Sequence, residues 1–214
     1  MIRSVILVSI ITFSSVACSQ NEIPAKEKDQ QNLKEASSVE LSAYDKKIIE
    51  KYEQLQQSFR TLVQEDFVIK QKEFLPEVLK IKDKKTREKL QMQIYTATEM
   101  YKEAYDLNEK LLKESFSTAR LVTKCELSYY AKIPKQEIEA CYTELAAIVQ
   151  KELKTTPKND PQYIYGEWGY LLFMYKSGHD EYKQKMENFI SSTKDETAKY
   201  QFQNSYEMAI ETHN

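Results

Sequence analysis

The chain of 214 residues contains only 3 glycines but 15 tyrosines, and 41% of its residues are hydrophobic. Glycine supplies the positive φ angles that tight β-turns need, so this composition argues against sandwiches, barrels and glycine-rich phosphate-binding folds. Lysine and arginine total 31 against 33 aspartates and glutamates, which gives a formal net charge of −2. This balance provides no electrostatic reason to expect a nucleic acid as partner.

The amino terminus has the three parts of a secretory signal peptide. Arg3 carries a positive charge, a short apolar run follows from Val5 to Phe13, and small residues come next. The apolar run is far shorter than the roughly 20 residues that a membrane-spanning helix needs. Residues 1–17 are therefore predicted to be a signal peptide that is removed on export.

The sequence Ser15-Val16-Ala17-Cys18 resembles the lipobox of bacterial lipoproteins, although the first position is more often a large aliphatic residue. The resemblance implies cleavage before Cys18 and attachment of acyl chains to this cysteine, which would anchor the protein to a membrane. Ser19 replaces the aspartate that keeps enterobacterial lipoproteins at the inner membrane, so we expect the outer membrane, on the periplasmic side. The alternative is an ordinary cleaved signal in which Cys18 plays no part.

Residues 19–40 are polar and nearly free of large apolar side chains. Such a segment buries too little apolar surface to fold alone. We interpret residues 18–40, with the lipidated cysteine, as a flexible tether. Random-coil scaling for about 22 residues gives this tether a reach of roughly 25–30 Å.

From Leu41 onwards, apolar residues recur at intervals of three and four, as in amphipathic helices. The sequence predicts an all-α domain over residues 41–214, a helical bundle of six to seven helices with αα-hairpins, which is large enough for a core. One stripe runs from Leu41 to Leu62. Phe67-Val68-Ile69 interrupts the pattern and is predicted to be a helix end or a loop, and Pro76 is predicted to open the next segment.

The later boundaries follow from capping residues and prolines. Residues 90–111 are predicted to form one long helix; a further stripe from Phe116 to Tyr129 either continues it or follows a turn at Ser115–Ser117. Two further helices are predicted to open at Pro134 and at Asp160-Pro161, and one to end at Gly178. Thr193 and Glu196 have the spacing of a capping box for the last helix.

Cys125 and Cys141 lie on the apolar stripes of two predicted helices that are joined near Ile133-Pro134. Residues equally distant from the turn of an antiparallel helix pair lie level with each other, so the two cysteines can reach disulfide distance. An oxidising periplasm would preserve the bond. Two buried free thiols are the alternative. No metal site is expected, because His179 and His213 are not spaced to complete one.

No established catalytic motif occurs in the chain, and the sequence therefore predicts neither an enzyme nor a cofactor. Glu167 is the only charged residue between Tyr163 and Tyr175. It is either a functional carboxylate with a raised pKa in an apolar setting, or a residue at the helix edge that reaches water or a lysine.

The helix predicted from Tyr163 to Tyr175 is apolar on nearly all sides, so it is either central in the bundle or presents aromatic residues to a partner. Gly166 and Gly169 favour the central position, because glycine in a helix is tolerated where another helix packs closely. For the partner-binding alternative, the candidate residues are Tyr163, Tyr165, Trp168 and Tyr170.

Two family resemblances concern the helical part. Trp168, Leu171 and Tyr175 match the spacing in the first helix of a tetratricopeptide repeat, but no 34-residue period recurs. Cys141 and Trp168 are similar to the cysteines and helix-borne tryptophan of helical periplasmic lysozyme-inhibitor lipoproteins. We expect a lipid-anchored protein of the cell envelope that binds another envelope protein. The alternatives are an inhibitor or immunity-type protein, and a hydrolase of cell-wall or lipid substrates.

Overall fold

The computed structural model describes residues 41–213, and all regular secondary structure in this part of the chain is helical, which confirms the predicted all-α fold. The predicted signal peptide, Cys18 and the tether lie outside the described residues. The predicted six to seven helices are too few, because these residues form nine α-helices and a short 3₁₀ helix. The elements are α1 (Ala43–Gln57), η1 (Ser58–Arg60), α2 (Gln64–Val78), α3 (Lys84–Ala97), α4 (Tyr101–Glu114), α5 (Thr118–Tyr130), α6 (Lys135–Leu153), α7 (Tyr163–Lys176), α8 (Tyr182–Ser192) and α9 (Glu196–His213).

Helix α2 accounts for two wrong predictions. The segment Phe67-Val68-Ile69 lies inside α2 instead of ending a helix, and Pro76 lies in the last turn of the same helix instead of opening a new one. Phe67, Gln71 and Val78 are buried and recur at helical spacing along α2. Three consecutive apolar residues obscure this face in the sequence, because Phe67 is buried whereas Ile69 is 53% exposed on another side of the helix. Packing against neighbouring helices stabilises the helix.

The long helix predicted over residues 90–111 is also wrong, because it is divided into α3 and α4. Glu99 adopts a left-handed backbone conformation with φ of 58°. The N–H of Met100 then donates to the carbonyl of Tyr95, and the hydroxyl of Thr98 donates to the carbonyl of Ile94, at 2.8 Å in both cases. These bonds satisfy carbonyl groups that the end of α3 leaves without an intrahelical partner.

Local hydrogen bonds also define the later helix ends. Ser117 accepts a hydrogen bond from the N–H of Arg120 and begins α5, so a turn separates α4 from α5. Gly178, with φ of 92°, follows α7 as predicted. The capping box at Thr193 is wrong, because Asp195 accepts the hydrogen bond from the N–H of Ala198 at 2.7 Å. Thr193 instead donates its hydroxyl to the carbonyl of Phe189.

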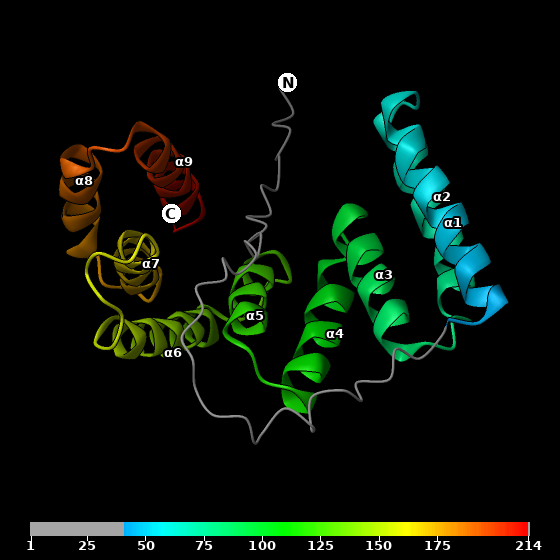
Figure 1. Cartoon of the computed structure of the whole chain (residues 1–214), viewed down its shortest axis with the longest axis horizontal. Helices are drawn as coiled ribbons and strands as arrows, with labels where there is room; N and C mark the ends of the chain where they lie inside the picture. The colour runs from blue at the N-terminus through cyan, green and yellow to red at the C-terminus, as the bar shows by residue number, and fades with distance from the viewer. Residues whose placement is uncertain (1–40, 214) are drawn as a thin grey trace, which may run out of the picture. The chain divides into compact units, whose positions relative to one another are not determined.

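Each helix packs mainly against its neighbours in chain order, and α9 also contacts α7 (Figure 1). Buried side chains within residues 41–213 accordingly form four clusters that follow one another along the chain, in place of one continuous core. The first lies among α1–α3, the second involves α3–α5, the third α5 and α6, and the last α7–α9. In such a sequential arrangement, stability depends on each hairpin and on the interfaces with its neighbours.

Asp45 connects α1 to the start of α3. Its carboxylate belongs to a residue that is 1% exposed, and it accepts hydrogen bonds from the N–H groups of Lys82 at 3.0 Å and Asp83 at 3.2 Å. Burial alone would raise the pKa of Asp45, but these bonds and the Ser42 hydroxyl outweigh burial and hold the pKa below its ordinary value. The folded state therefore favours the charged carboxylate.

We expect the stability provided by Asp45 to be lost in acid. Because folding lowers the pKa of Asp45, its contribution is complete above the unfolded value of about 3.9 and disappears as the pH falls through the folded value. Asp45→Asn should therefore be less stable than the unmodified chain near neutral pH, and the difference should shrink below about pH 4. Urea unfolding of both proteins across this pH range measures the difference. A difference independent of pH would contradict this account.

Candidate functional site

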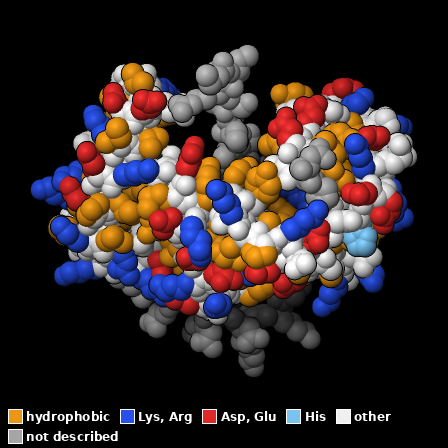
Figure 2. Space-filling model, turned by 180° about the vertical axis from the view of Figure 1, so that it is seen from behind, with side chains coloured by type: hydrophobic (Ala, Val, Ile, Leu, Met, Phe, Trp, Pro, Cys, Tyr) orange, Lys and Arg blue, Asp and Glu red, His pale blue; other side chains and the backbone are white. Residues whose placement is uncertain are grey.

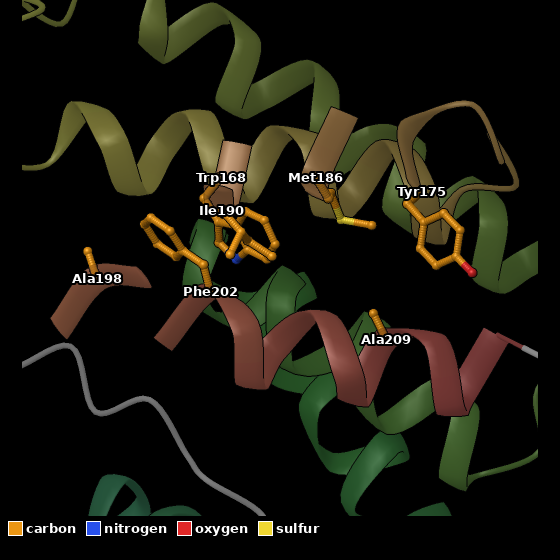
Figure 3. Close-up of a cluster of buried hydrophobic side chains, with 7 residues drawn as sticks. All are labelled: Trp168, Tyr175, Met186, Ile190, Ala198, Phe202 and Ala209. Carbon is orange, nitrogen blue, oxygen red and sulfur yellow. The ribbon is translucent and has the colours of Figure 1, made fainter. Parts of the chain in front are cut away.

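Trp168 lies in the last cluster, among α7, α8 and α9 (Figure 3). Its side chain is only 6% exposed, its ring stacks on Phe202 with 4.9 Å between centroids, and its indole N–H donates to the Ser205 hydroxyl at 2.9 Å. The core interpretation of this helix therefore holds for Trp168. Its assignment as a partner-binding residue is corrected, because a ring enclosed by three helices presents no surface to a partner.

The three candidate tyrosines of α7 do not form one surface. Tyr165 is 36% exposed and meets the edge of the Phe202 ring on α9. Tyr170 lies on another side of α7, where its hydroxyl is 3.3 Å from that of Tyr182. Tyr163 is half-buried at the start of the helix, where it lines a shallow depression with residues from the end of α6. Helix α7 thus uses its aromatic side chains mainly to pack against α6, α8 and α9.

Of the two helical glycines, only Gly166 lies where another helix approaches closely. A Cβ atom at Gly166 would be 2.9 Å from Cδ2 of Leu153 on α6, whereas a Cβ atom at Gly169 would meet nothing nearer than Phe173 at 3.8 Å. The close-packing explanation therefore applies to Gly166. At Gly169, the space for a methyl group is already present.

Gly169→Ala should stabilise the protein by roughly 1 kcal/mol, because alanine has a much higher helix propensity and enters without a clash. Gly166→Ala provides a matched comparison in the same helix. It should stabilise less than Gly169→Ala, or destabilise, because the Leu153 side chain must move. Thermal unfolding of the two variants measures this order, and a greater gain in stability at Gly166 would contradict the close approach of Leu153 to α7.

The structure joins Cys125 of α5 to Cys141 of α6 by a disulfide, as predicted, with 5.6 Å between their Cα atoms. Both residues are buried in the third cluster. Glu126 directly follows Cys125, and Tyr142 directly follows Cys141. The disulfide therefore fixes the separation of α5 and α6 directly beside Glu126 and Tyr142.

Glu126, Tyr142 and Lys176 form a site that the sequence analysis missed, and we call it the lysine–tyrosine site. Lys176 is the last residue of α7; its ammonium nitrogen lies 5.1 Å from the centre of the Tyr142 ring and 3.4 Å from the Tyr142 hydroxyl. The Tyr142 ring in turn contacts Phe173 of α7, with 6.0 Å between ring centroids. Three helices, α5, α6 and α7, each contribute one of the three polar side chains.

Both charged groups of the lysine–tyrosine site are displaced towards their neutral forms. Burial lowers the pKa of the Lys176 ammonium, and the negative charge of Glu126 opposes this effect only in part. Burial likewise raises the pKa of the Glu126 carboxylate, against the attraction of Lys176. Within residues 41–213, neither group takes part in a direct ion pair. Glu126 is exposed and Lys176 is half-buried, so the surrounding protein removes only part of their solvent, and the attraction between the two groups does not fully offset that loss.

Three tyrosines adjoin this site, and we call them the tyrosine group: Tyr101 of α4 and Tyr129 and Tyr130 of α5. Tyr101 and Tyr130 stack with 4.8 Å between ring centroids, and Tyr129 meets Tyr130 edge to face at 5.3 Å. Because Tyr129 and Tyr130 come three and four residues after Glu126, they lie on the same side of α5 as its carboxylate. Tyr129 is 46% exposed, so part of the tyrosine group is accessible.

The other candidate residues provide little further chemistry. Glu167 is half-buried and interacts with Tyr163 in its own helix, which fits the helix-edge interpretation. Among residues 41–213, no three His, Cys, Asp or Glu residues come together as a metal site. No helix in the same range has the length and apolar character needed to cross a bilayer. No family model matches this chain, and no curated protein or solved structure matches it either.

Proposed function

We propose that this chain is a lipid-anchored protein of the cell envelope that binds another envelope protein through helices α4–α7. The observation that supports the proposal is the tyrosine group beside the lysine–tyrosine site, with a partly exposed aromatic surface and two charged groups that form no ion pair within residues 41–213. Tyrosine is enriched at protein interfaces, because it combines a large apolar area with a hydroxyl group. A partner would cover this area and supply groups that pair with Lys176 and Glu126.

The arrangement of helices supports a binding role. Because the helices pack mainly on their chain neighbours, their outer faces form an extended surface. One view of the molecule shows hydrophobic side chains interrupted by lysine, arginine and acidic groups (Figure 2). Such a mixed surface fits a protein partner, since non-obligate protein interfaces are about as apolar as the remaining surface. The predicted tether would hold this surface within reach of other envelope proteins.

Site-specific photo-crosslinking in intact cells tests the partner. A photoreactive amino acid replaces Tyr129, which is 46% exposed in the tyrosine group, and in a second protein replaces Tyr200, which is 68% exposed on α9. We expect one discrete crosslinked protein from position 129 and none from position 200. The same capture from both positions, or none from position 129, would contradict binding through α4–α7. Loss of the captured protein's own activity on binding would indicate an inhibitor or immunity-type protein.

A separate measurement tests the anchor. The intact mass of protein extracted from its native membrane should correspond to cleavage before Cys18 plus acyl chains. Cys18→Ser should leave the signal uncleaved or release the protein from lipid attachment, while crosslinking from position 129 in purified components should persist. A mass without acyl chains would refute the anchor alone.

A further inference from the structure

We propose that the lysine–tyrosine site binds a carboxylate group of the partner polypeptide, with Lys176 holding the carboxylate and Glu126 accepting a hydrogen bond from a neighbouring N–H of the same partner. This inference rests on the proposed function, because it assigns the chemistry recognised at that surface. The shared ligand chemistry is a carboxylate, which a partner provides either on an acidic side chain or at its C-terminus.

Lys176 is placed to bind an anion. Its ammonium carries three hydrogen-bond donors, and the Tyr142 hydroxyl, at 3.4 Å, is the acceptor that the described residues offer. The aromatic ring of Tyr142, which packs against that of Phe173, covers one side of the ammonium. No carboxylate of residues 41–213 lies within ion-pair distance of this ammonium, and the charge of Glu126 offsets its burial only in part. An incoming carboxylate would supply the charged hydrogen bond that Lys176 does not make within these residues.

The charge of Glu126 determines which class of anion the site favours. One lysine and one glutamate give the site no net charge when both are ionised. A phosphate group would bring about −1.5 to −2 charges towards Glu126 and be repelled. A carboxylate brings a single negative charge, and the main chain next to it carries an N–H that can donate a hydrogen bond to the Glu126 carboxylate. The pair of opposite charges therefore favours a peptide carboxylate over a phosphate.

Small acetylated amino acids test this assignment on the full-length chain purified in detergent. The probes are acetyl-glutamate amide, with a side-chain carboxylate, acetyl-alanine, with a terminal carboxylate, and acetyl-glutamine amide, the neutral counterpart of the first. Titrations are followed by the NMR signals of the Lys176 side chain. We expect saturable shifts with at least one carboxylate probe and none with the neutral probe. The probe that binds identifies the source of the carboxylate.

Matched lysine variants complete the test. Lys176→Gln should weaken carboxylate binding roughly tenfold or more, as loss of a charged hydrogen-bond donor does, and Lys176→Arg should retain it. Lys183→Gln on α8 removes an exposed lysine and should leave binding unchanged. For the variants, binding is followed by the signals of the Tyr142 ring. Equal shifts with the neutral probe, or unaltered binding in Lys176→Gln, would overturn the inference while the crosslink from position 129 still stood.

Discussion

Phe202→Ala should lower the free energy of unfolding by about 3–5 kcal/mol, the usual cost of removing a large aromatic side chain from a core. Phe202 is 1% exposed, and its ring contacts those of Trp168, at 4.9 Å between centroids, and Phe189, at 5.6 Å. Because these residues belong to the last of four sequential clusters, we expect α7–α9 to unfold before the other helices.

The single tryptophan makes this expectation measurable, because Trp168 reports on the last cluster alone. In Phe202→Ala, urea unfolding followed by tryptophan fluorescence should occur at lower denaturant than unfolding followed by circular dichroism. Tyr200→Ala changes an aromatic residue of the same helix that is 68% exposed, and should alter stability by no more than about 0.5 kcal/mol. Coincident transitions in Phe202→Ala would show that the clusters unfold as one unit.

Removal of the disulfide should cost about 3 kcal/mol, because Cys125 and Cys141 are separated by 16 residues and the bond restricts a loop of this length in the unfolded chain. The double variant Cys125→Ala, Cys141→Ala removes the bond without leaving a free thiol at either position. Because α5 and α6 lie in the middle of the sequence of helices, their loosening also weakens the packing of α4 and α7.

Unfolding with and without a reducing agent measures this effect. The reducing agent should destabilise the unmodified chain by about the same amount as the double substitution, and should leave the double variant unchanged. It should also weaken carboxylate binding, because Glu126 and Tyr142 directly follow the two cysteines. Identical unfolding curves under both conditions would mean that the bond contributes nothing to stability.

Helix type and helix ends depend on residues close together in the chain, so the sequence could predict many of them. Helical periodicity indicated the all-α fold, and Gly178 indicated the end of α7, because a left-handed residue after a helix favours glycine. The spacing of Cys125 and Cys141 about their turn favoured the disulfide over two free thiols, and the structure contains the bond. The division into α3 and α4 was missed, because the apolar stripe continues across Glu99 with unbroken helical spacing.

The sequence by itself therefore determined the helical fold class and indicated that Cys125 and Cys141 can reach each other. It left open whether α7 is central in the bundle or presents aromatic residues to a partner. Only packing against Phe202 and Ser205 of α9 decided that Trp168 is a core residue. The lysine–tyrosine site also exists only in the tertiary structure. Glu126, Tyr142 and Lys176 are far apart along the chain, and no local pattern marks them. The packing of α5 on α6 and of α6 on α7 brings these side chains together and removes part of the water that would otherwise solvate the charges of Glu126 and Lys176.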